Sequence, residues 1–508
     1  MTQEIEVKFL IDRKDIQLLD RHQQLKSLIR GEKQTKRVVS TYLDTPQLAL
    51  KKSGVGFRLR QVGDGWVQTV KASGKGGGSL SARQEFESPI ENGMPDWDAL
   101  AESPFASLFA DPEVRQTILP MFVTDFERTK WYLELEDFTT LELAVDVGEI
   151  RAGEQVEPLC EMELELKGGN AQSLLKTAIA LAETLPVTTE GRSKAARGYA
   201  LVVKPEWTPV KGANLKLDPK ATVSQGFAAM MRNCLEQVLA NEQPVLFGTD
   251  IEGVHQFRVG LRRMRSLLSV FKPFLPERQR EFWNTELRWL GGEFGPARDW
   301  DVFCDETLVP IEGYFGEWDS LREVREKAEA QRREGYVRAR AAIRSHRYCL
   351  LILKLYNWLD REVWRNGADE TQLDGWDSSL ENFAHHLLDK VHGKFFKLGK
   401  RYEDLDIEQR HELRIRGKKV RYAAEFFASL YPKEKSAAYL KSLKSAQDRL
   451  GALNDAAVAD ELFQILDLGN EHAGAALIRG WFACKVETQH ASFQRVWKGF
   501  KNHRKFWH

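Results

Sequence analysis

Charged side chains at every second position are the residues of this chain best suited to chemistry. The opening stretch QEIEVKFL carries Glu4, Glu6 and Lys8 with apolar residues strictly between them. This alternation is typical of a β-strand with one charged and one apolar face. For one such strand alone, the simplest explanation is a sheet whose outer face meets water.

A later stretch, LCEMELEL, carries three acidic residues in the same alternation, Glu161, Glu163 and Glu165. Along one face of a strand they follow each other at about 6.5 to 7 Å, and their mutual repulsion is unfavourable unless cations neutralise it. Hard divalent metals bound by oxygen ligands are the natural neutralisers. These three residues are candidate metal ligands, together with Glu4 and Glu6.

Basic residues are gathered on other strands in the same way, namely Arg58, Arg60, Lys71, Arg128 and Lys130. Arginine favours bidentate contacts with phosphate oxygens, so these strands suit an anion with several oxygens. A sheet exposed to water would mix Ser, Thr, Lys and Glu, whereas here acidic and basic strands are separated.

The pattern predicts an α+β region: a closed antiparallel β-barrel whose charged faces line a tunnel and whose apolar faces point outward to flanking helices. Such a tunnel suits a polyphosphate chain accompanied by divalent metals. Two roles stay open for Glu85, Glu87 and Asp146, because structural ion pairing fits the pattern as well as catalysis does.

The periodicity changes along the chain and predicts two domains. Alternating segments dominate residues 1–201, while residues 221–508 show helical periodicity nearly throughout, which predicts an all-α domain. The stretch 202–220 holds three prolines without sustained periodicity and is interpreted as a linker. Residues 1–201 carry 25 Lys and Arg against 31 Asp and Glu, and residues 202–508 carry 49 against 43.

Composition excludes several classes of protein. No apolar run approaches the roughly eighteen residues that a membrane span requires, and the first residues lack a signal region, so a cytoplasmic protein without a membrane partner is expected. The five cysteines are far apart and show no CxxC spacing, which argues against a disulfide framework and against a zinc site built on cysteine.

The helical half repeats itself at a constant offset of 156 positions. His255, Arg258, Arg262 and Arg265 recur as His411, Arg414, Lys418 and Arg421, and Gly295, Asp299 and Val302 recur as Gly451, Asp455 and Val458. One offset over seven positions predicts two pseudo-symmetric repeats, centred on residues 255–302 and 411–458. Asn454 stands where the first repeat has Arg298, so the repeats need not bind anions equally.

Each repeat carries a basic stripe at helical spacing. One such helix would be explained by a solvated basic face, but its recurrence favours an anion-binding groove. For the two histidines, phosphate contact or structural hydrogen bonding is favoured over metal binding. A nucleic acid is the alternative polyanion, but no specific nucleic-acid partner is expected, because the total charge is balanced and no reader motif is present.

The charged residues of the first half match an ordered set of motifs. They are the ExExK of EIEVK, the RxR of Arg58 and Arg60, Lys71, the ExE of Glu85 and Glu87, Arg128, the DxG of Asp146 and Gly148, the triplet Glu161, Glu163 and Glu165, and the SK motif of Ser193, Lys194, Arg197 and Tyr199. In these motifs residues 1–201 resemble CYTH domains, the triphosphate tunnel metalloenzymes. The second half resembles CHAD domains, on the strength of His255, His411 and the basic stripes, and the combination resembles bacterial inorganic triphosphatases.

The resemblance implies hydrolysis of inorganic triphosphate to pyrophosphate and phosphate with Mg²⁺ or Mn²⁺. The implied catalytic and substrate-binding residues are Lys8, Arg58, Arg60, Lys71, Arg128, Lys130 and Lys194, with Arg197 added for substrate binding although ion pairing is favoured for it. The implied metal ligands are Glu4, Glu6, Glu161, Glu163 and Glu165. The CHAD resemblance implies polyphosphate binding by the two basic stripes. Two alternatives stay open: a polyphosphate-binding protein without catalysis, or a phosphohydrolase acting on thiamine triphosphate or a nucleoside triphosphate.

Overall fold

The computed structural model describes residues 3–63, 65–72, 80–316, 318–469 and 471–508. Within these ranges the side chains of residues 3–4, 62, 80–83, 407, 452–459 and 490–491 lie outside the description. The chain divides into two compact units, which are described separately. Unit 1 comprises residues 1–207 and 343–360, and unit 2 comprises residues 208–342 and 361–508.

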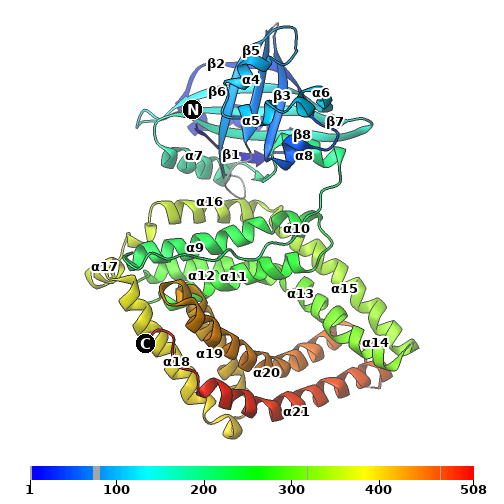
Figure 1. Ribbon diagram of the computed structural model, residues 1–508, viewed down its shortest axis with the longest axis vertical. Coiled ribbons are helices and arrows are strands. Elements are labelled where there is room, and N and C mark those ends of the chain that lie inside the picture. Colours follow the sequence, from blue (N-terminus) through cyan, green and yellow to red (C-terminus); the bar gives the residue numbers. More distant parts are fainter. Residues whose placement is uncertain (1–2, 64, 73–79, 317, 470) are drawn as a thin grey trace. The chain divides into compact units, whose positions relative to one another are not determined.

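Unit 1 is built on a nine-stranded sheet in the order β5-β4-β3-β2-β6-β7-β8-β1-β9 (Figure 1). The strands are β1 (Gln3–Leu10), β2 (Ile29–Asp44), β3 (Val55–Val62), β4 (Gly65–Ala72), β5 (Leu80–Ile90), β6 (Leu119–Glu134), β7 (Thr140–Ala152), β8 (Gln155–Gly168) and β9 (Thr188–Thr189). Every pairing between neighbours is antiparallel. The predicted antiparallel sheet with flanking helices, followed by a helical region, is confirmed.

The prediction that the sheet closes into a barrel is wrong. Strand β1 pairs with β5 through residues 3–7, with β8 through residues 6–10, and with β9 through residues 9–10. Among the described pairings, only Glu6 and Val7 therefore have partners in both β5 and β8. The sheet is therefore not closed into a barrel, because the first residues of β1 pair with β5 and its last residues pair with β8 and β9.

The apolar face of the sheet is covered by helices. Its core packs residues of β1, β6, β7 and β8 against α7 (Ala171–Thr184) and α16 (His346–Asp360), including Val7, Leu164, Leu181 and Leu353. A second core lies between β2 to β4 and the short helices α3 to α6. The shorter helices of the unit are α1 (Gln17–Arg21), α2 (Gln23–Leu28), α3 (Ala49–Lys52), α4 (Trp97–Ala101), α5 (Ala106–Phe109), α6 (Pro112–Thr117) and α8 (Lys194–Val202).

Helix α16 is the element that the sequence assigned to the other half of the chain. Its apolar residues Cys349 and Leu353 are fully buried in the core of the sheet. The His346 ring contacts the carbonyl oxygen of Ala182 on α7, and Lys354 pairs with Glu183 at 2.7 Å. This helix is therefore part of unit 1, although it lies more than 130 residues beyond the sheet in the chain.

Unit 2 is helical. Its elements are α9 (Val223–Ala240), α10 (Glu242–Phe247), α11 (Glu252–Val270), α12 (Glu277–Glu293), α13 (Gly295–Asp301), α14 (Val309–Phe315), α15 (Asp319–Ile343, its last residue grouped with unit 1), α17 (Glu370–Asp377), α18 (Leu380–Gly399), α19 (Ile407–Phe427), α20 (Lys433–Ile465) and α21 (Ala473–Lys501). Among the described helices of the chain, none is long and apolar enough to cross a bilayer.

The helices of unit 2 recur at nearly the offset seen in the sequence. Helices α18, α19 and α20 begin 157, 155 and 156 positions after α9, α11 and α12. The N-caps of α12 and α20 are both proline, Pro276 and Pro432. The far ends of the two sets share a core that joins Trp300 and Phe303 to Phe463 and Ile478.

The segment 208–218 has no regular structure, but it is held against unit 2. Asn241 exchanges two hydrogen bonds with the backbone of Val210, at 2.9 and 2.7 Å, and the amide of Leu217 donates to Ser429 at 3.0 Å. The prolines of this stretch indicate a linker but do not indicate that it is held in place. The side chains that hold it, Asn241 and Ser429, lie elsewhere in the chain and carry no signal in the sequence.

Candidate active site

The charged face of the sheet encloses a cavity of about 910 Å³ in unit 1. Its lining includes most of the residues singled out in the sequence: Glu6, Lys8, Arg58, Arg60, Lys71, Glu85, Glu87, Arg128, Lys130, Glu163, Glu165 and Lys194. Strands β1, β3, β4, β5, β6 and β8 and the start of α8 therefore contribute charge to one space. The prediction that these alternating faces meet inside the fold matches this arrangement.

The strand register arranges the acidic side chains in rows. Glu6 of β1 lies opposite Glu165 of β8, which lies opposite Glu142 of β7, and all three line the cavity. Like charges directly opposite on one face of a sheet destabilise it. Lys130 pairs with Glu142 at 2.8 Å and Lys167 pairs with Glu165 at 2.7 Å, so lysines of the chain offset part of the repulsion in this row.

A second acidic group lies deeper and is surrounded by cations. Asp146, Glu161 and Glu163 each place a carboxylate oxygen within 4.8 Å of the others. Lys194 bonds to all three, at 2.7 Å to Asp146 and 2.9 Å to Glu163 and with a very short contact to Glu161. Lys8 lies 3.1 Å from Glu163 and 3.6 Å from Glu161.

Arg128 completes this deeper group. It donates to both oxygens of Asp146, at 2.6 and 2.5 Å, and to Glu163 at 2.7 Å. Burial acts to raise the pKa of Glu163, yet that pKa lies well below its usual value because Lys194, Lys8 and Arg128 surround the carboxylate. Burial raises the pKa of Glu161, because its desolvation outweighs the attraction of the neighbouring lysines.

The opposite wall of the cavity is basic. Arg58 donates to the Tyr42 hydroxyl at 3.4 Å and lies 3.7 Å from Glu85. Arg60 donates to the Ser40 hydroxyl at 3.2 Å. Burial, followed by repulsion from Arg58 and Arg128, lowers the pKa of Arg60 to about 10. This crowding of like charges is the electrostatic signature of an anion site.

Helix α8 places Lys194 in the cavity. Ser193 caps the helix by accepting from the amide of Ala196 at 3.1 Å, which fixes Lys194 as its first residue. Gly198 packs directly on the ring of Phe122, where a Cβ atom would collide with the ring. Phe122 in turn stacks on Tyr42 with ring centroids 4.5 Å apart. The glycine therefore allows α8 to approach the sheet closely enough for the lysine to reach the carboxylates.

The DxG motif has a similar structural reason. A Cβ atom on Gly148 would overlap the backbone of Asp125 and Phe126 on the neighbouring strand. The close approach of β6 and β7 brings Arg128 opposite Asp146 in the register. Asp146 thus acts as an ion-pair partner, one of the two roles left open from the sequence.

Three residues expected at the site differ from the rest. Glu161 is fully buried and lies outside the cavity lining. Arg197 also lies outside the lining and pairs with Glu157 at 2.8 Å, with Glu161 at 3.2 Å and with the Pro158 carbonyl at 2.6 Å. The Glu4 side chain is outside the described part of the structure.

Other residues of the site were not predicted from the sequence. The cavity lining also includes Tyr42, Glu142, Lys167 and Arg192. Glu142 belongs to the alternating stretch LELAVDVGEI and could have been found because it lies on the same strand face as Asp146. Tyr42 and Arg192 carry no comparable signal, because one stands among buried apolar residues and the other follows a glycine in a loop.

The donor set suits a hard divalent cation. Glu6, Glu163, Glu165 and Glu142 present carboxylate oxygens to the cavity, and Mg²⁺ and Mn²⁺ prefer oxygen ligands. Glu163 is paired with Lys8, Arg128 and Lys194 but lines the cavity, whereas Asp146 and Glu161 are paired with cations and lie outside the lining. These four carboxylates of the cavity lining therefore fit a metal better than Asp146 and Glu161 do.

In unit 2 the first basic stripe lies along one half-buried side of α11. Burial lowers the pKa of Arg258, with further lowering from Arg262 and Arg298, and burial with repulsion from Arg288 lowers that of Arg265. Burial also lowers the pKa of His255. The Nε atoms of Arg262 and Arg265 are buried without a hydrogen-bond partner, so this stripe holds unsatisfied donors.

The second stripe lies on α19, which packs against α11 through the stacking of Arg263 on the Phe426 ring, 5.1 Å from its centroid. His411 is exposed, and Arg414, Lys418 and Arg421 are half-buried. Arg421 donates to Glu425 at 2.7 Å. The side chains of Asn454, Asp455 and Val458 lie outside the described residues. The two stripes thus differ in burial and in counter-charge.

Comparison with known proteins assigns both units. A CYTH domain matches residues 2–199, and a CHAD domain matches residues 229–464. Inorganic triphosphatase from Haemophilus influenzae is 37% identical over 208 residues, which are 40% of this chain and 55% of that protein. The match thus spans about half the length of that relative.

A solved structure resembles the CHAD domain of this chain. The crystal structure of the CHAD domain from the plant Ricinus communis is 32% identical, with a TM-score of 0.51, and covers 58% of this chain and 98% of that one. A structure from Hippeastrum described as a putative adenylyl cyclase with a dominant triphosphatase activity is 19% identical, with a TM-score of 0.31, over 40% of this chain and 98% of that one. This second likeness is too low to carry an argument.

Proposed function

We propose that this chain, which combines a CYTH domain with a CHAD domain, is a metal-dependent inorganic triphosphatase that splits triphosphate into pyrophosphate and phosphate. The observation that carries the proposal is the single cavity in which a basic wall faces a row of carboxylates. The relative named inorganic triphosphatase matches over the CYTH region, which supports the same reaction. The proposal requires an enclosed charged cavity and does not require complete closure of the sheet.

The basic residues would bind the substrate and stabilise its leaving group. Arg58, Arg60 and Lys71 lie on adjacent strands β3 and β4 and present donors to one side of the cavity. Their donors would hold phosphate oxygens of the end that leaves, since guanidinium groups match these oxygens in pairs. A buried, electropositive wall stabilises charge that grows on a leaving pyrophosphate without reorganisation of water.

Lys8, Arg128, Lys130 and Lys194 would act from the side of the acidic residues. Each already contacts a carboxylate, so its position is fixed before substrate binds. Fixed donors of this kind position the phosphoryl group for in-line attack, which is the main contribution of protein side chains to phosphoryl transfer. None of these steps requires a covalent nucleophile.

Mg²⁺ or Mn²⁺ would be held by Glu6, Glu163 and Glu165, with Glu142 beside them and Glu4 as a further ligand expected from the sequence. When bound, such an ion neutralises phosphate charge and lowers the pKa of a bound water. Within the chain, Lys130 and Lys167 offset part of the repulsion in this row. Glu161 is assigned a supporting role, because it lies outside the cavity lining and holds Lys194 and Arg197 in place.

The CHAD unit would bind polyphosphate through the basic stripes of α11 and α19. The supporting observation is the set of half-buried arginines with lowered pKa values and unsatisfied Nε donors on α11. An anion with many oxygens relieves both the repulsion and the unsatisfied hydrogen bonding. Binding of labelled polyphosphate to the full chain is expected to weaken in Arg262→Ala, and equal displacement by DNA and polyphosphate would refute a preference for polyphosphate.

The reaction is tested by measuring phosphate release from triphosphate with and without Mg²⁺. Metal-dependent turnover whose KM for triphosphate rises at least tenfold in Arg60→Ala supports the proposal. Tight binding of triphosphate without turnover would instead show a binding protein. Comparing kcat/KM for triphosphate, thiamine triphosphate and ATP then identifies the substrate, and a higher value for either of the last two would overturn inorganic triphosphate as the substrate.

A further inference from the structure

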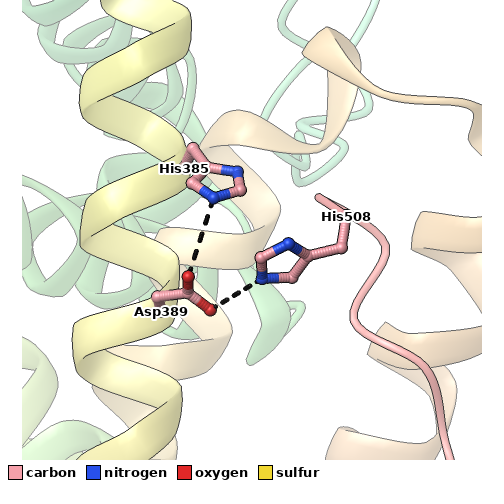
Figure 2. A group of neighbouring side chains, drawn as sticks. All are labelled: His385, Asp389 and His508. Carbon is pink, nitrogen blue, oxygen red and sulfur yellow. Dashed lines mark hydrogen bonds and ion pairs between the residues drawn. The ribbon is translucent and has the colours of Figure 1, made fainter.

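Three side chains that can bind a metal lie together in unit 2, whereas the candidate active site belongs to unit 1. His385 and Asp389 stand four residues apart on α18, so they share one face of the helix. His508 approaches them from the segment that follows α21 (Figure 2). One ligand atom from each residue lies within 4.8 Å of the others.

The carboxylate of Asp389 faces both imidazoles, whose ring centroids are 4.5 Å apart (Figure 2). The Nε2 atom of His385 is 3.7 Å from Oδ2, and the Nε2 atom of His508 is 3.0 Å from Oδ1. Both rings thus turn the same nitrogen toward one carboxylate. Two imidazole nitrogens and one carboxylate oxygen are a donor set typical of Zn²⁺ and of neighbouring divalent transition metals.

The backbone fixes which nitrogen of His385 is available. Its Nδ1 atom lies 3.0 Å from the carbonyl oxygen of Trp507, and a carbonyl can only accept, so Nδ1 carries the proton. The Nε2 atom of the neutral ring is then left with its lone pair directed at the cluster. A hydrogen bond from the second nitrogen to a backbone carbonyl is the usual support of a metal-bound histidine.

A metal would compete with a cation already present. Lys505 lies 2.6 Å from Oδ1 of Asp389, and the indole of Trp507 donates to the same oxygen at 3.1 Å. Despite partial burial, these contacts and that of His508 hold the pKa of Asp389 below its usual range. Oδ1 of Asp389 thus already has three partners, and a metal would replace its contacts with Lys505 and His508, which reduces the affinity.

We propose that His385, Asp389 and His508 form a binding site for a divalent transition metal, with Zn²⁺ as the expected ion. The side chains are 37%, 34% and 47% exposed, so an ion can enter from solvent and water can complete its coordination. Binding would fasten the segment from Lys505 to His508 onto α18. The site uses none of the residues assigned to triphosphate or polyphosphate.

The test is calorimetric titration of Zn²⁺ into the full chain in millimolar Mg²⁺, which occupies sites built from oxygen ligands alone. One Zn²⁺ site is expected in the unaltered chain, weakened at least tenfold in His385→Ala and in Asp389→Asn. His386→Ala is the matched control, because that histidine is the next residue on the same helix, and it is expected to leave binding unchanged. Titration without a site, or an equal loss in the control, would overturn the proposal.

A second variant distinguishes a metal site from a cluster that only forms ion pairs. Lys505→Met removes the competing cation, so Zn²⁺ binding is expected to tighten at least threefold and the Zn²⁺-induced rise of the unfolding temperature to grow. If these residues only form ion pairs and bind no metal, Lys505→Met would weaken the attachment of the segment to α18, and Zn²⁺ would not raise the unfolding temperature of any variant. Because neither readout measures triphosphate hydrolysis, the outcome is independent of the proposed reaction.

Discussion

A carboxylate that lines the cavity of unit 1 should affect metal binding when it is removed, whereas one buried outside the lining should affect stability. Glu6 and Glu161 test this directly. Glu6 lines the cavity, whereas Glu161 is fully buried and contacts Lys8, Lys194 and Arg197. Replacing either by glutamine keeps the shape of the side chain and removes its charge. We expect Glu6→Gln to weaken the metal and Glu161→Gln to weaken the fold.

The two magnitudes follow from these surroundings. Loss of one charge-assisted contact to a metal costs about 1.5 to 3 kcal/mol, so Glu6→Gln should raise the Mg²⁺ concentration for half-maximal activity by about tenfold or more. Removing one partner of a buried ion pair costs about 3 kcal/mol or more. For a unit of this size, Glu161→Gln should lower the unfolding midpoint by about 10 °C.

The assay is phosphate release from triphosphate over a range of Mg²⁺ concentrations, with thermal unfolding of the same samples. Glu6→Gln should shift the Mg²⁺ midpoint while the unfolding temperature stays within about 2 °C. Glu161→Gln should show the reverse. If Glu161→Gln shifts the Mg²⁺ midpoint more than Glu6→Gln does at an unchanged unfolding temperature, the assignment of Glu6 to the metal and of Glu161 to stability is wrong.

Three further changes test other parts of the structure. Arg60→Ala should raise KM for triphosphate at least tenfold without loss of stability, whereas Arg37→Ala, an exposed residue paired with an aspartate, should leave kinetics unchanged; equal effects would contradict the assignment. Gly198→Ala should lower the unfolding midpoint by several degrees, since overpacking against Phe122 costs about 1 to 3 kcal/mol, and an unchanged midpoint would contradict it. Burial and Lys505 lower the pKa of His392 to about 4. Below about pH 6.5 the unfolded state therefore binds the proton more readily, and the free energy of unfolding should fall by about 3 kcal/mol towards pH 4. Chemical denaturation of His392→Phe should show a weaker dependence of the unfolding free energy on pH, and the same pH dependence as the unaltered chain would refute this.

The sequence predicted the face on which a charged residue lies, because the period of two in a strand determines the face. Lys8 and Glu163 are cross-strand partners in the register, as the alternation of both strands leads one to expect. The period does not determine depth. Glu161 and Glu163 share a face, but of these two only Glu163 reaches the cavity, because Lys194 and Arg197 arrive from a helix about thirty residues further along the chain and cover Glu161.

Long-range packing was also beyond the sequence. The apolar stretch of α16, with Leu353 at its centre, has the periodicity of any buried helix, and periodicity does not name the surface that the helix covers. Closure of the sheet was beyond the sequence for a related reason. The alternating stretch QEIEVKFL is β1 residue for residue, but its pattern does not tell that β1 divides its pairing among β5, β8 and β9. The offset of 156 positions, by contrast, carried through to the helix boundaries of unit 2.

Hydrolysis at the charged cavity is tested most directly by following triphosphate with ³¹P nuclear magnetic resonance in the presence of the full chain. The proposed hydrolysis predicts that, with Mg²⁺ present, triphosphate signals are replaced by equal amounts of pyrophosphate and phosphate over many turnovers. It also predicts that the reaction stops when a chelator removes the metal, and that it slows at limiting Mg²⁺ when Glu165 is replaced by glutamine. Unchanged triphosphate in the presence of Mg²⁺, or an equal rate in the chelator, would contradict it.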